Sequence, residues 1–173
     1  MNLQLGYMKE GWKQNEYRWK VSPHNKVIWP FESKPVWKGE KGRRVALWKE
    51  QGIGDQIIML SLFHEVNKMC ASLSVYVDPR LRSLCMRAMP EINFVEDLEA
   101  LQNTECDYHL PLISLGGLIR NDISDFDKTV TGYLKADPQR VELIRNELKL
   151  DGKTVIGISW KSFNSRYKTK SVQ

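Results

Sequence analysis

The hydrophobic pattern changes period twice between Val45 and Asp78. A short apolar run, Val45 to Trp48, leads into a loop with glycines at positions 52 and 54. After this loop, apolar residues recur at helical spacing, at Ile58, Leu62, Val66 and Met69. Leu73 to Val77 then alternates and is rich in β-branched and aromatic residues, as is typical of a strand. The order strand, glycine loop, helix, strand predicts a βαβ unit.

The rest of the chain continues to alternate strands with helices. Further strands are predicted at Ile92 to Val95, Tyr108 to Ile113 and Val155 to Trp160. Helices are predicted to start at Asp78-Pro79 and at Asp137-Pro138, since Asp is a good cap and Pro suits the first turn. This alternation predicts an α/β fold, a Rossmann-like three-layer domain with a mostly parallel sheet and helices on both faces.

The predicted Rossmann-like domain spans residues 45–162. Residues 1–20 are predicted to form a short helical arm, which carries the large aromatics Tyr7, Trp12, Tyr17 and Trp19. Residues 21–44 hold several prolines and little periodicity, so we interpret them as a linker. We expect residues 163–173 to begin a crossover to a second domain that this chain does not contain.

Composition narrows the class of protein. A length of 173 residues suits one α/β domain with a short appendage. No apolar run approaches the ~20 residues of a membrane span, and the N-terminus lacks the apolar core of a secretory signal. Cys70, Cys85 and Cys106 are odd in number and widely spaced, which favours reduced thiols. We therefore expect a cytoplasmic protein without a membrane span.

The net charge and the spacing of the Cys and His residues indicate which ligands the chain is expected to bind. The net charge of +5 is compatible with anions such as nucleotide diphosphates. The lysines and arginines are scattered, so no specific nucleic-acid binding is predicted. No cluster of Cys and His has metal-ligand spacing, and no metal site is predicted.

The glycine loop permits a dinucleotide site as one interpretation. Gly52 and Gly54 follow a strand and open a helix, and Asp78 ends the next strand at about the ~20-residue distance expected of a ribose-binding acid. The third glycine of that fingerprint would fall at Ile57, whose branched side chain fills the space that close helix–strand packing needs. Tight NAD binding is therefore not expected.

A second interpretation comes from the whole loop. Glu50-Gln51-Gly52-Ile53-Gly54-Asp55 resembles the "EQG-apolar-GD" loop of glycosyltransferases fused behind tetratricopeptide repeats, and more distantly the family-nine heptosyltransferases. Gly11-Trp12 and Glu16 to Trp19 resemble the end of the last repeat in that family. In the same order follow matches to its later motifs, at Pro35 to Gly39, at Asp107 to Leu115 and at Gly157 to Ser162. The resemblance covers nearly the whole chain, although Gly116 replaces the usual proline.

This resemblance implies an N-terminal, acceptor-side domain of a two-domain glycosyltransferase of the GT-B type. Such an enzyme moves a hexosyl or heptosyl group from a nucleotide-sugar donor to an acceptor hydroxyl, and uses no cofactor besides that donor. The acceptor would be a glycan, a lipid-linked molecule or a protein, and upstream repeats would bind protein. Alone, the acceptor-side half is expected to be inactive. The alternatives are an NAD(P)-type dinucleotide-binding domain and a non-catalytic interaction domain.

The resemblance also assigns candidate site residues. Asp55 would be the catalytic base that takes the proton from the attacking hydroxyl. Substrate binding would fall to seven further residues: Gln51, Gly52, Gly54, His109, Ser114, Trp160 and Lys161.

Several of these candidates have a structural interpretation as well. Asp55 could be only a helix N-cap, Ser114 only a turn cap, and His109 a structural residue of an apolar strand. Trp37 could stack on a sugar or pack the linker onto the domain.

Overall fold

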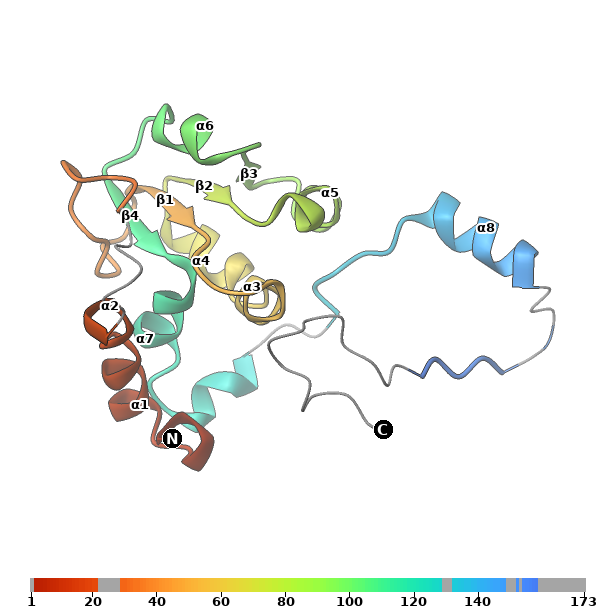
Figure 1. The fold of residues 1–173 in the computed structure, drawn as a ribbon, viewed down its shortest axis with the longest axis horizontal. Coiled ribbons are helices and arrows are strands. Elements are labelled where there is room, and N and C mark those ends of the chain that lie inside the picture. Colours follow the sequence, from red (N-terminus) through yellow and green to blue (C-terminus); the bar gives the residue numbers. More distant parts are fainter. Residues whose placement is uncertain (1, 22–28, 129–131, 149–151, 153, 159–173) are drawn as a thin grey trace. The chain divides into compact units, whose positions relative to one another are not determined.

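The computed structural model describes residues 2–21, 29–128, 132–148, 152 and 154–158 (Figure 1). They belong to two compact units, Met1–Lys135 and Ala136–Gln173. The elements of the first unit are η1 (Asn2–Leu5), α1 (Met8–Asn15), α2 (Arg18–Val21), β1 (Arg44–Trp48), α3 (Ile53–Leu60), α4 (Phe63–Met69), β2 (Ser72–Tyr76), α5 (Pro79–Ala88), β3 (Asn93–Phe94), α6 (Leu98–Gln102), β4 (Tyr108–Pro111), η2 (Leu112–Ser114), α7 (Leu115–Ile119) and η3 (Ile123–Lys128). The second unit contains α8 (Pro138–Leu148).

The four strands form one parallel sheet in the order β3-β2-β1-β4. The central strand β1 pairs with β2 from Arg44 opposite Ser72 to Trp48 opposite Tyr76. On its other side β1 pairs with β4, and Trp48 lies opposite Pro111. All three pairings are parallel, as the alternation of strands and helices predicted, which confirms the α/β fold.

Helices cover both faces of this sheet. Val45 and Leu47 of β1 belong to the larger apolar cluster, with residues of α3, α4, α5 and α7. Ala46 and Trp48 belong to the other cluster, which includes Leu101 of α6. Figure 1 shows α6 on one face of the sheet and α3 and α4 on the opposite face. The domain is therefore three-layered and Rossmann-like, and a short helical segment precedes it.

The predicted long helix after the glycine loop is divided into α3 and α4. The Ser61 hydroxyl donates a hydrogen bond of 2.6 Å to the carbonyl of Ile58, and the Ser61 and Leu62 amides bond to Ile58 and Met59 three residues back. A serine hydroxyl that donates to a carbonyl of the preceding turn competes with the backbone hydrogen bonds of an α-helix. Backbone hydrogen bonds to the third preceding residue, as in a 3-10 helix, also tighten the last turn. The helix therefore ends at Leu60 and a new one begins at Phe63.

The arm packs directly on the domain through Trp12. Its indole Nε1 donates a hydrogen bond of 2.8 Å to the carbonyl oxygen of Arg120. The ring lies so close to α7 that a Cβ at Gly116 would be 2.2 Å from Trp12 Cζ2. Gly116 is thus required for space, and the arm is part of the first compact unit.

The second unit confirms one prediction and corrects another. Asp137 Oδ1 accepts from the amides of Gln139 and Arg140 and so caps α8, as expected. The predicted buried strand at Val155 to Trp160 is wrong in its described part, because residues 154–158 form no strand and Ile156 is 79% exposed. A strand needs a neighbour for its hydrogen-bond ladder, and these residues have none in the described ranges.

We predict that Gly116→Ala lowers the free energy of unfolding by about 2 kcal/mol, because the added methyl group overlaps the Trp12 ring. Gly54→Ala is a matched control, since a Cβ there meets nothing within 4 Å and alanine favours a helix. Denaturant unfolding of both variants tests this. In a Trp12→Ala background the cost of Gly116→Ala should largely disappear. An equal cost in both backgrounds would contradict the proposed contact.

Candidate functional site

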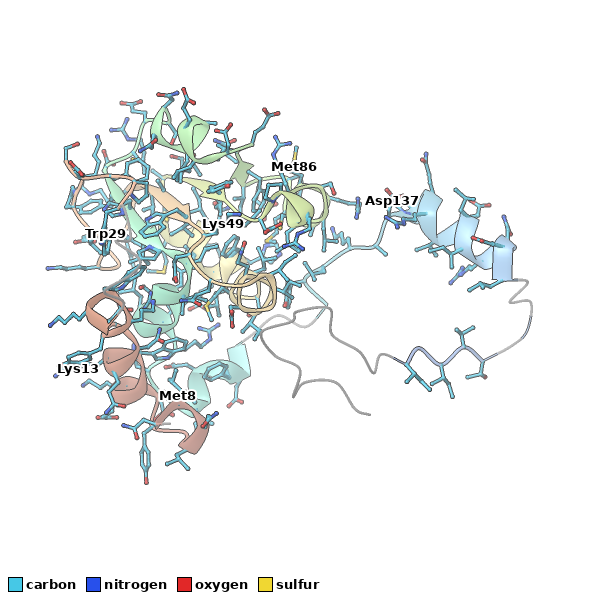
Figure 2. All side chains as sticks on the ribbon, in the orientation of Figure 1. Met8, Lys13, Trp29, Lys49, Met86 and Asp137 are labelled. Carbon is cyan, nitrogen blue, oxygen red and sulfur yellow. The ribbon has the colours of Figure 1, made fainter. Side chains whose placement is uncertain are left out.

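The carboxyl ends of β1, β2 and β4 meet at one edge of the sheet because these strands are parallel. Ligands of open α/β sheets bind beyond this edge. Lys49, labelled in Figure 2, is the first residue after β1, and its Nζ lies 3.7 Å from Oδ2 of Asp78, which follows β2 by two residues and caps α5. The Gln51–Asp55 loop therefore starts where the sequence predicted a site.

Gln56 holds this loop in place. It is 1% exposed, and its Nε2 donates a hydrogen bond of 2.9 Å to the carbonyl oxygen of Gln51. Its Oε1 accepts one of 2.8 Å from the backbone amide of Asp78. Both ends of the Gln56 amide thus tie the loop to the end of β2. Sequence reasoning missed this residue, and the available signal was a polar side chain on the same helical face as Met59 and Leu60.

Gly54 leaves the start of α3 open, whereas a Cβ at Gly52 would lie 3.2 Å from Asp55 Oδ2. Gly52 is the N-cap of α3, with φ −61° and ψ 165°, an ordinary extended conformation. A Cβ at Gly54 would have nothing within 4 Å. Asp55 lies in the first turn and is exposed, and no hydrogen bond or ion pair of its side chain occurs among the described residues. The N-cap interpretation of Asp55 is therefore wrong.

Glu50 joins this loop to the arm. Its Oε1 accepts hydrogen bonds from Arg18 Nη2 at 3.2 Å and from the backbone amide of Ile113 at 3.1 Å. The side chain of Glu50 is only 5% exposed and that of Arg18 only 15%. The ion pair is largely shielded from water, and it connects α2, the β1–α3 loop and the segment after β4.

Ser114 takes part in the same cluster. Its hydroxyl accepts a hydrogen bond of 2.8 Å from Arg18 Nη2 and donates one of 2.8 Å to Glu16 Oε1. Arg18 Nη1 also donates to Glu16 Oε1. Ser114 stands at the N-cap position of α7, where the turn was predicted to begin, but its hydroxyl makes no cap hydrogen bond to that helix. Sequence reasoning quoted Glu16 and Arg18 only as part of a motif and missed their contacts with the loop and Ser114.

His109 lies in the middle of β4, where it is 1% exposed. Its Nδ1 accepts a hydrogen bond of 3.1 Å from Trp48 Nε1, which can only donate, so the imidazole is neutral with its proton on Nε2. The ring stacks on Phe31 at 5.2 Å and meets the edge of Trp29 at 5.5 Å. Burial lowers the pKa of His109. This geometry matches the structural interpretation of His109.

The remaining candidates are Trp37, Trp160 and Lys161. Trp37 is 1% exposed and donates from Nε1 to the carbonyl oxygen of Glu40, so it packs the linker onto the domain. Trp160 and Lys161 lie outside the described residues. Within the described ranges, no three His, Cys, Asp or Glu side chains gather as metal ligands. In the same ranges, none of the helices has the length and apolar character to cross a membrane.

Asp78, the acid of the dinucleotide interpretation, already has partners. Its Oδ1 caps α5 by accepting from the backbone amide of Arg80 at 3.1 Å and also accepts from Arg80 Nε at 2.9 Å. The bonded Arg80 guanidinium holds the pKa of Asp78 well below its usual range. A ribose hydroxyl would have to compete with these contacts.

Comparison with known proteins shows a distant similarity to a bacterial protein. The chain is 25% identical to Protein FlbA of Caulobacter vibrioides over an alignment 185 residues long, which includes 92% of this chain. The chain spans about 30% of the length of that relative. No family model and no solved structure matches the chain.

We predict that His109 makes the fold sensitive to acid. Because burial lowers its pKa in the folded protein, the unfolded chain takes up the proton first as pH falls below about 6.5. The stability that the neutral imidazole contributes is complete above that pH and is lost as pH falls through the folded-state pKa. Urea unfolding between pH 7.5 and 5 should show that the free energy of unfolding falls more steeply with falling pH in the parent than in His109→Asn, because asparagine cannot take up a proton. Equal slopes would contradict this assignment.

Proposed function

We propose that this chain supplies the acceptor-side part of a GT-B glycosyltransferase, which moves a hexosyl or heptosyl group from a nucleotide-sugar to an acceptor hydroxyl. The observation that carries the proposal is the Glu50–Asp55 loop. It follows the central strand of a parallel sheet, Gln56 and Glu50 hold it from both sides, and its exposed part presents Gly54 and Asp55 to solvent. A site that is ordered before its ligand binds loses less entropy on binding.

Asp55 is the proposed base. Its exposed carboxylate has no competing partner among the described residues, so it is free to accept the proton of an incoming hydroxyl. The backbone amides at the N-terminus of α3, beside Gly54, would also hold a sugar hydroxyl or a phosphate of the acceptor. Gln51 is exposed beside them and would contact the acceptor.

His109 and Ser114 have supporting roles in this proposal. Ser114 and Arg18 together fix Glu50, and His109 orders the sheet through Trp48. The acceptor would be a glycan, a lipid-linked molecule or a protein, and the setting would be the cytoplasm, where the free thiols of Cys70, Cys85 and Cys106 remain reduced. Trp160 and Lys161 remain proposed substrate contacts.

A non-catalytic interaction domain is the second candidate. The described second unit favours it, because α8 presents Leu143, Ile144 and Leu148 at 68%, 44% and 56% exposure. A dinucleotide site has less support. Ile57, where the third glycine would stand, packs against the apolar cluster, and its carbonyl oxygen accepts a 2.8 Å hydrogen bond from the Tyr133 hydroxyl.

We predict that Asp55→Asn and Asp55→Ala each reduce sugar transfer roughly a hundredfold or more, because neither side chain accepts a proton. Both should melt within about 1 °C of the parent, since the Asp55 side chain is exposed and caps nothing. Transfer rates and thermal melts should be measured on a gene product that joins this chain to a donor-binding domain. Glu99→Gln is the control, since Glu99 is an exposed acid in the first turn of α6. A sugar-transfer rate of Asp55→Asn close to that of the parent would show that Asp55 is not the catalytic base.

A further inference from the structure

A groove of about 370 Å³ lies between the arm and the domain. Its walls include Trp12 of α1, Trp37 of the linker, Leu110 of β4 and Leu118 of α7. The volume falls in the lower part of the range of ~300–1,000 Å³ that is usual for small-molecule sites. It is therefore large enough for a small ligand.

The walls offer apolar surface to a ligand. The indole nitrogen of Trp12 is bonded to the Arg120 carbonyl and that of Trp37 to the Glu40 carbonyl. Trp37 is 1% exposed and forms only the floor of the groove. The apolar side chains that a ligand can contact are the half-buried Trp12 and Leu118 and the 40% exposed Val36. An apolar chain or ring is the group that such a surface binds, because burial removes its hydrocarbon from water.

The rim of the groove is cationic. Lys9 and Lys13 line it, one helical turn apart on α1, and both are exposed. Neither ammonium group has a carboxylate partner among the described residues. Glu16 also lines the groove, but its carboxylate already accepts from Arg18, Ser114 and Trp19.

We propose that this groove binds a small amphipathic anion, with its hydrocarbon against Trp12, Val36 and Leu118 and its carboxylate or phosphate beside Lys9 and Lys13. The volume of about 370 Å³ lies within the range of small-molecule sites and favours a small ligand. Asp55 does not line the groove, although Ser114 and Glu16 of the cluster around Glu50 do, and the inference goes beyond the proposed sugar transfer. Its assay measures binding alone, so the two proposals fail independently.

Titration calorimetry with decanoate tests this proposal on the chain as it is. Decanoate should bind at one site, whereas acetate, which lacks the chain, and decyltrimethylammonium, which reverses the charge, should bind at least tenfold more weakly. Decyl phosphate should bind about as well as decanoate if the site recognises the charge of the head group. Equal binding of decyltrimethylammonium, or no binding of either anion at millimolar concentration, would overturn the proposal.

Variants locate the site. Lys9→Gln with Lys13→Gln should weaken decanoate binding about tenfold, and the matched pair Lys41→Gln with Lys68→Gln, at exposed positions that do not line the groove, should not. Val36 lines the groove and is 40% exposed, so Val36→Asp should fold and repel the anion, whereas Val36→Asn should bind it. Unchanged binding in the Lys9/Lys13 and Val36→Asp variants would place decanoate elsewhere. Binding only to anionic phosphatidylglycerol vesicles would assign the lysines to a membrane surface and overturn the proposal.

Discussion

The ion pair between Arg18 and Glu50 determines how the arm and the candidate loop are arranged. Glu50 Oε1 is held by Arg18 and by the Ile113 amide, while its Oε2 is buried without a hydrogen-bond partner among the described residues. Removing one partner of a buried pair leaves an uncompensated charge and typically costs about 3–5 kcal/mol. Because Glu50 is also the first residue of the motif that ends at Asp55, the start of the loop depends on a residue of the arm.

This dependence gives the arm a role beyond that of an appendage. Trp12 fixes α1 on α7, Arg18 fixes α2 at the edge of the sheet, and Trp19 packs 5.8 Å from Trp48 over the second apolar cluster. The groove that we propose as an anion site exists only because α1 forms one of its walls. Removing the arm would therefore expose the sheet, open the groove and free Glu50 together.

Local patterns predicted most of the fold, and contacts distant in sequence explain the rest. The parallel sheet and the position of the glycine loop follow from runs of apolar residues and from Gly52 and Gly54, which are readable over a few positions. The pairing of Arg18 with Glu50 bridges 32 positions and that of Trp48 with His109 bridges 61, so no local pattern contains them. The expected strand at Val155 failed for a related reason, since an apolar run forms a strand only where a neighbour completes its hydrogen bonds.

Hydrogen exchange at the amides of residues 51–56, which comprise the candidate loop and the first turn of α3, tests most directly whether the Arg18–Glu50 ion pair orders the loop. It should be measured in the parent, in Arg18→Met and in the control Lys20→Met. Lys20 is an exposed cation in the same short helix, and none of its described contacts reaches the loop. If the ion pair orders the loop, Arg18→Met should speed exchange in the loop at least tenfold, and Lys20→Met should leave it unchanged. Faster exchange in the arm with an unchanged loop would contradict the claim that the arm orders the candidate site.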